Sequence, residues 1–222
     1  MKMNLSESIL RNIKETYEVG GVSTDKVIKA LKDLQNNLDD IAFSYFDEGD
    51  SDIAQPLYRL YKIKSPLVQD YLVDDDLGFA YPDVGEILYT GEVDNLEIKV
   101  YGPMFITYDK SGMLGFDHRI SVMLLPDGQA DYDLVLGSND ITSLPEVIRD
   151  AEEEKDTETV DKLKDMSLKL LSVKHQIISA CVDKCEEIRR KFIDEAFKIS
   201  EEHKKEVANK QRQTAKALNP IK

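Results

Sequence analysis

The sequence predicts an α+β fold, and three patterns along its 222 residues indicate it. Before residue 46, apolar residues recur every three or four positions, which is typical of amphipathic helices. Between residues 96 and 136 the apolar period changes to two, as in half-buried strands. From Thr157 to Leu218 the chain contains neither proline nor glycine, so a helix can continue almost to the C-terminus.

The N-terminal region, residues 1–73, is predicted to be helical. The apolar spacing predicts one helix over residues 4–17 and a second over residues 24–45, each preceded by a capping residue. The segment 56–73 is ambiguous, because LYRLYKIK suits either a strand or a helical turn. Within it, Ser65-Pro66 is typical of the start of a helix.

The central region, residues 74–142, is predicted to form an antiparallel meander of about five strands. LEIKVY at 96–101 and MLGFDHRISVMLL at 113–125 alternate between apolar and polar positions. The turn signals between the strands, such as Asp94-Asn95, leave connections too short for anything but antiparallel neighbours. His118 falls on the apolar side of its strand, so we expect a core residue rather than a metal ligand.

The C-terminal region, residues 143–222, is predicted to form a long helix with a basic tail. Its proline-free part spans about 62 residues, or about 90 Å if it is unbroken. An apolar seam follows the helix and predicts a surface for self-association or for a protein partner, although the same stripe would suit packing within the chain. The partner-binding residues predicted from this seam are Leu163, Leu170, Ile177, Ile188, Phe192 and Ile199.

Charge is distributed unevenly in this chain, whose net charge is -14. Residues 1–150 contain 13 basic and 28 acidic side chains, whereas residues 151–222 contain 16 and 15. The acidic part should repel nucleic acid and attract cations or basic protein surfaces, although the charge also serves solubility.

The tail after Glu202 has the opposite sign, with six Lys or Arg against one acid, Glu206. It is predicted to contact an acidic partner surface or nucleic-acid phosphates, and its lack of aromatic residues argues against base stacking. A solvated helix end, whose cations suit the helix dipole, is the third interpretation. The predicted contact residues are Lys204, Lys205, Lys210, Arg212 and Lys216.

Several classes of protein and site are disfavoured by the composition. No apolar run is long enough to cross a bilayer, so we expect a soluble, cytoplasmic protein with no membrane partner. Cys181 and Cys185 make no disulfide framework and are expected to be buried. Asp74-Asp75-Asp76 lacks the spacing of a calcium loop. With no phosphate loop or catalytic triad in the sequence, no cofactor is expected.

One stretch, YPDVGEILYTGEVDNLEIKVY, suggests a specific chemistry. Pro82-Asp83 followed by Glu97-Ile98-Lys99 resembles the motif of the PD-(D/E)xK nuclease superfamily. The resemblance implies that Asp83 and Glu97 hold a divalent metal and that Lys99 orients the attacking water. The chain departs from the family pattern because another predicted hairpin, not a helix, follows the Lys99 strand. A solvent-exposed charge pair explains the same residues without catalysis.

These observations favour a non-catalytic interaction or assembly protein, either homo-oligomeric or bound to a protein partner through its long C-terminal helix. A nucleic-acid accessory protein that uses the basic tail is the alternative. A metal-dependent nuclease using Asp83, Glu97 and Lys99 is the second alternative.

Overall fold

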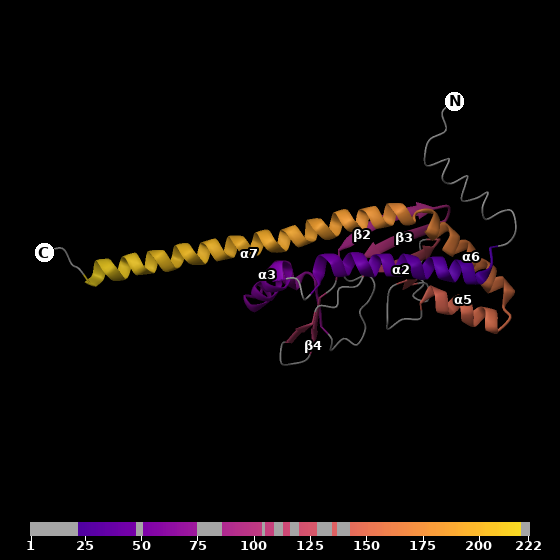
Figure 1. Cartoon of the computed structure of the whole chain (residues 1–222), viewed down its shortest axis with the longest axis horizontal. Helices are drawn as coiled ribbons and strands as arrows, with labels where there is room; N and C mark the ends of the chain where they lie inside the picture. The colour runs from indigo at the N-terminus through magenta and orange to yellow at the C-terminus, as the bar shows by residue number, and fades with distance from the viewer. Residues whose placement is uncertain are drawn as a thin grey trace, which may run out of the picture.

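The structure is a computed structural model that describes residues 22–47, 51–74, 86–103, 105–108, 113–115, 120–127, 135–136 and 143–218 (Figure 1). Its helices are α2 (Thr24–Phe46), α3 (Ser51–Lys62), α4 (Pro66–Gln69), α5 (Leu144–Glu153), α6 (Thr157–Ser172) and α7 (Lys174–Leu218). Its strands are β1 (Leu72–Asp74), β2 (Ile87–Val93), β3 (Leu96–Tyr101), β4 (Phe105–Tyr108), β5 (Met113–Gly115), β6 (Ser121–Pro126) and β7 (Val135–Leu136). The α+β class is therefore confirmed.

Most of the described N-terminal region before residue 70 is helical, with non-helical residues at 22–23, 47 and 63–65. Helix α2 buries the predicted seam, including Leu31, Leu34 and Leu38, and its polar residues face solvent. The ambiguous segment begins inside α3 and continues into α4, which starts at the predicted Ser65-Pro66 signal. The helix predicted over residues 4–17 lies outside the described residues.

The strands do not form the single five-stranded meander that we predicted. A four-stranded antiparallel sheet has the order β2-β3-β6-β7, and β1, β4 and β5 form a separate three-stranded sheet. The predicted strand 113–125 is split between them, because β5 pairs with β4 whereas β6 pairs along the whole of β3. Strand β1 pairs with β4 in parallel, so the smaller sheet is mixed.

Strand β3 confirms the predicted alternation of faces. Ile98 and Val100 are buried in the main core, whereas Glu97 and Lys99 on the other face are partly exposed. Its neighbour β6 is buried on both faces from Ser121 to Leu125, although alternation alone predicted a half-buried strand. A period of two cannot show whether the second face of a strand is also covered.

The C-terminal region contains three helices rather than one continuous helix. The chain leaves helical geometry at residues 154–156, and again at Val173, where φ is -107° and ψ is 6°. Near this break the Ser172 hydroxyl donates to the Lys169 carbonyl oxygen at 2.6 Å, which competes with helical backbone bonding. The change of direction at Val173 allows the apolar stripes of α6 and α7 to face one core.

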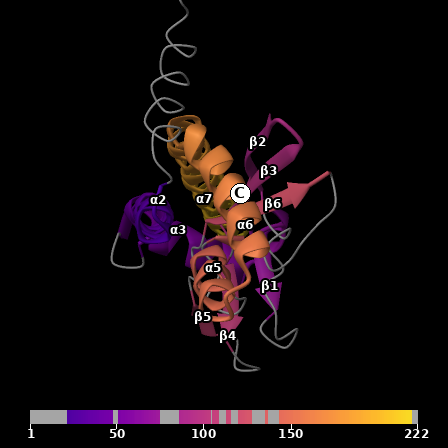
Figure 2. The same cartoon turned by 90° about the vertical axis from the view of Figure 1, so that its right-hand side faces the viewer.

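Helix α7 is the central element of the packing. Figure 2 shows it between α2 on one side and strands β2 and β3 on the other. Its first half contacts α2, α3 and β2, and one core cluster includes residues from all three predicted regions. Its second half extends away from the other elements, toward the C-terminus (Figure 1).

Candidate interaction surface

The first half of α7 is attached to the body of the protein by contacts from three directions. Arg189 donates a hydrogen bond to the backbone oxygen of Tyr45, at the end of α2, at 3.2 Å. The Tyr89 hydroxyl of β2 donates to Gln176 Oε1 at 3.2 Å. Phe192 packs edge-on against Tyr71, with ring centroids 5.3 Å apart. The helix is therefore fixed in direction before it leaves the body.

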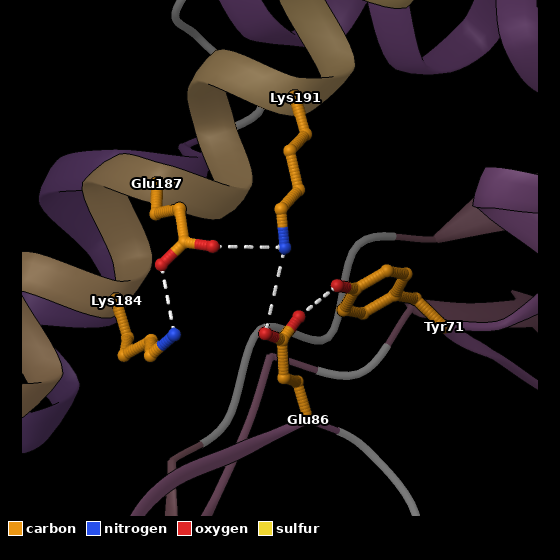
Figure 3. Close-up of polar contacts among 5 residues, drawn as sticks. All are labelled: Tyr71, Glu86, Lys184, Glu187 and Lys191. Atoms are coloured by element: carbon orange, nitrogen blue, oxygen red, sulfur yellow. Dashed lines mark hydrogen bonds and ion pairs between the residues drawn. The ribbon is translucent and has the colours of Figure 1, made fainter.

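A cluster of polar side chains joins α7 to the residue before β2 (Figure 3). Lys191 Nζ lies 3.1 Å from Glu187 Oε1 and 3.6 Å from Glu86 Oε1. Lys184 Nζ pairs with the other oxygen of Glu187 at 2.8 Å. The Tyr71 hydroxyl donates to Glu86 Oε2. Glu86 thus forms an ion pair with Lys191 of α7, about a hundred residues later in the chain, and accepts a hydrogen bond from Tyr71, which precedes it.

The protonation states of this polar cluster suit a structural contact between α7 and the residue before β2. Burial, followed by the hydrogen bond to Glu86, raises the pKa of Tyr71, so its phenol stays protonated in the neutral range. The hydrogen bond that Lys191 donates to Glu187 raises the pKa of Lys191, which keeps this amine charged. A nucleophile or general base near neutral pH needs the opposite shifts.

The two cysteines are buried on the core face of α7, as predicted. Burial raises the pKa of the Cys181 thiol to about 12, and burial together with the charge of Glu86 does the same for Cys185. Both thiols are free and protonated, so neither is an activated nucleophile.

The predicted partner-binding seam mostly serves the chain's own core. Leu163, Leu170, Ile177, Ile188 and Phe192 are all buried in the main core cluster, and Ile199 is half-buried against it. The period of the stripe is the same whether it packs inside the chain or against another chain. The structure places these residues of α6 and α7 in the internal core or against it.

The nuclease-like residues do not assemble into a described site. Lys99 Nζ lies 3.2 Å from Glu97 Oε1, with both side chains about a third exposed on the same strand face, whereas Asp83 lies outside the described residues. An open pocket beside this pair is lined by Thr90, Gly91, Glu92, Asn95, Glu97 and Asp127. Its carboxylates would repel a phosphodiester, and Glu97–Lys99 has the geometry of an exposed ion pair.

The other candidate ligands also give no metal site in the described part of the chain. Among the residues that the structure describes, no three His, Cys, Asp or Glu side chains are arranged to hold a metal ion. His118, Asp75 and Asp76 lie outside the described residues, and of Asp74 the structure describes the backbone in β1.

The basic tail lies on the part of α7 that leaves the body. Every residue from Glu202 to Thr214 is exposed, and we call this range the exposed segment. Lys204 pairs with Glu201 at 2.7 Å along the helix. Within the described residues, Lys205, Lys210 and Arg212 have no ion-pair partner. Residue 216 belongs to α7, but the position of its side chain is not described.

The chain matches no family model, no curated protein and no solved structure. Its function is therefore inferred from its own residues. In the described part of the chain, no helix combines the length and the apolarity that a bilayer crossing requires.

Sequence reasoning did not find the polar cluster of Tyr71, Glu86 and Lys191. These residues lie on three separate elements, and no motif links a tyrosine, a glutamate and a lysine at such spacing. The basic tail, by contrast, was visible in the charge count, because its members are close together in sequence.

Proposed function

We propose that this protein is a non-catalytic interaction or assembly protein, whose contact element is the exposed segment of α7. The observation that carries the proposal is a helix of 45 residues whose first half packs in the core and whose residues 202–214 are exposed and extend away from the other elements (Figure 1). Such a helix measures about 67 Å, which is longer than a core of this size needs.

The fixed half of α7 supports the helicity of the exposed segment. A helix of about a dozen residues is marginal alone, because nucleation is costly, but extending an existing helix avoids that cost. Buried residues such as Ile188 and Phe192 hold the preceding turns in place. Lys, Glu and Gln make up seven of the thirteen residues of the exposed segment and are good helix formers. The segment therefore presents its side chains in a fixed direction.

The charge of the exposed segment favours an acidic partner surface. Lys205, Lys210 and Arg212 are exposed, and the helix carries them beyond the acidic body. Charges are screened over about 8 Å at physiological salt, so the body cancels little of the field around residues this far away. A partner that meets the segment end-on encounters net positive charge, which steers association and sets its orientation.

The non-catalytic part of the proposal is supported by the state of the reactive groups. Cys181, Cys185 and Tyr71 have raised pKa values and stay protonated, and Glu97 is paired with Lys99. A cytoplasmic location is also part of the proposal, because both cysteines are free thiols, as is usual in reducing compartments.

Nucleic acid is the second candidate partner, and the same three exposed cations support it. They are few for independent binding, because each phosphate contact contributes modestly and is lost as salt rises. The exposed segment has no aromatic residue for base stacking. For these reasons a protein surface is the preferred partner.

Site-specific photo-crosslinking tests the proposal. A photoreactive phenylalanine analogue replaces Lys205 in the exposed segment or, as the matched control, Lys29, an exposed lysine of α2. After irradiation of cells that express the protein, we expect the analogue at position 205 to form a discrete crosslinked adduct with the partner and the analogue at position 29 to form none. Digestion with protease or nuclease followed by mass spectrometry then identifies the adduct. The same adduct at both positions, or no adduct at position 205, would overturn the proposal.

A further inference from the structure

The turn between α5 and α6 carries a concentrated negative charge at one end of the molecule. Residues 150–161 contain seven acids and one base, Lys155, and all seven acids are exposed. The net charge of +1 over residues 151–222 conceals this patch, because it averages the acidic turn with the basic tail. We call residues 150–161 the acidic turn.

Two residues of the acidic turn are placed against the local electrostatics. Glu152 and Glu153 lie in the last turn of α5, where the helix dipole favours cations, and that turn contains no basic residue. Neither has an ion-pair partner among the described residues. Asp156, by contrast, caps α6 by accepting from the Thr159 amide at 3.1 Å. Residues that are unfavourable for local stability and have no compensating contact are expected at functional sites.

The acidic turn and the exposed segment lie at opposite ends of the long axis. Figure 1 shows the α5–α6 connection at the right-hand end and the end of α7 at the left-hand end. The two therefore cannot meet within one chain. Lys205 and Arg212 are seven residues apart, which places them on one face of the helix, available to a second molecule.

From this charge complementarity we propose that the exposed segment docks on the acidic turn of a second copy of this chain, in an antiparallel dimer. The inference rests on the proposed function and names its partner. In an antiparallel alignment, the exposed segment of each copy reaches the acidic turn of the other copy. Once one of these contacts has formed, the second forms within the same complex and strengthens the dimer. Two-fold pairing also closes the assembly. Pairing of one tail with another is disfavoured, because their positive charges repel each other.

Sedimentation velocity of the purified full chain at low and high salt tests this proposal. At low salt we expect a species of twice 25.3 kDa, which dissociates to the monomer as salt rises. Reversing the tail with Lys205→Glu and Arg212→Glu should weaken dimerisation about tenfold or more, as should Glu152→Lys with Glu153→Lys. All four substitutions in one chain should recover part of the dimerisation that the tail reversal alone removes, because the acidic turn then carries less negative charge and repels the reversed tail less.

The control variant is Lys26→Glu with Lys29→Glu, which changes the net charge as much as the tail reversal does, on exposed positions of α2. It should dimerise like the wild type. Circular dichroism of each variant verifies that the helices are retained, and Lys205→Gln with Arg212→Gln replaces the tail reversal if that variant loses helix.

Four results would overturn the inference. These are a wild-type monomer at every concentration, a mass that grows beyond the dimer, equal weakening by the α2 control, and no recovery in the fourfold variant. A monomer whose position 205 still crosslinks to another protein or to nucleic acid would reject the second copy while the proposed function stands. A monomer without any crosslink rejects both.

Discussion

Lys191 Nζ in α7 lies 3.6 Å from Glu86 Oε1, just before β2, and Glu86 in turn accepts a hydrogen bond from Tyr71. This relationship connects the helix that leaves the body to the sheet and to the segment after α4. Lys191 precedes Phe192, on which Tyr71 packs, and both residues of α7 lie close to the point where its buried part ends. The cluster therefore stabilises the last part of α7 that is still attached, and so the direction of the exposed segment.

Replacing Tyr71 with phenylalanine should lower the free energy of unfolding by about 1 to 2 kcal/mol. The substitution keeps the ring packed on Phe192 but removes a hydrogen bond to a charged acceptor. Urea denaturation measures the change. Tyr58→Phe is the matched control, because Tyr58 is 51% exposed and should change stability by less than about 0.5 kcal/mol. Similar losses in both variants would contradict a stabilising role for the cluster.

The free energy of unfolding should fall as the pH rises above about 8.5. Cys181 and Cys185 ionise near that pH in the unfolded chain, whereas their folded pKa values are about 12. Their folded pKa values are raised, so the stability that they contribute is complete below about pH 8.5 and is lost as pH rises toward 12. Urea denaturation at several pH values measures the slope.

The double variant Cys181→Ala with Cys185→Ala serves as the comparison for the pH dependence. It should be less stable overall, because two buried side chains are truncated, but its stability should fall less steeply with alkaline pH. In the wild type, a thiol reagent at neutral pH should label neither cysteine until urea unfolds the chain. Rapid labelling of the native protein would show that these thiols are accessible.

Two phenylalanines on α7 should respond very differently to truncation. Phe192→Ala should cost about 3 to 5 kcal/mol, because Phe192 is fully buried and packs against Tyr71. Phe197→Ala, five residues later, should cost less than about 0.5 kcal/mol, because Phe197 is 66% exposed. Thermal or urea denaturation of the pair locates the point at which α7 leaves the core. Comparable losses would mean that the core extends farther along the helix.

Ending the chain at Glu202 should remove helical signal without weakening the remaining fold. The residues after it are exposed as far as Thr214, so in high salt, where the proposed dimer is dissociated, the midpoint of urea unfolding should be unchanged, while far-ultraviolet circular dichroism loses signal in proportion to the deleted turns. Both are measured on the same samples. A lower midpoint would indicate that the deleted residues pack on their own body, which contradicts the proposed role of the exposed segment.

Local patterns predicted the elements whose stability comes from near neighbours in sequence. The seam of α2, the faces of β3, the start of α4 at Pro66 and the helicity of residues 157–218 all follow from periodicity and capping. The positive tail was equally visible, because its charges are close together. The acidic turn was not, because the charge count over residues 151–222 averages it with the basic tail.

The sequence by itself thus determined the α+β class, the amphipathic faces and the sign of charge along the chain, since each depends on residues a few positions apart. Only the tertiary structure decided which strands pair, where the C-terminal helices break and what covers the seam of α7. Strand β3 pairs with β6, beyond an intervening hairpin, and the choice depends on hydrogen bonds between distant segments. The seam of α7 is buried internally because α2, α3 and β2 all meet it, which a stripe of apolar residues cannot show in advance.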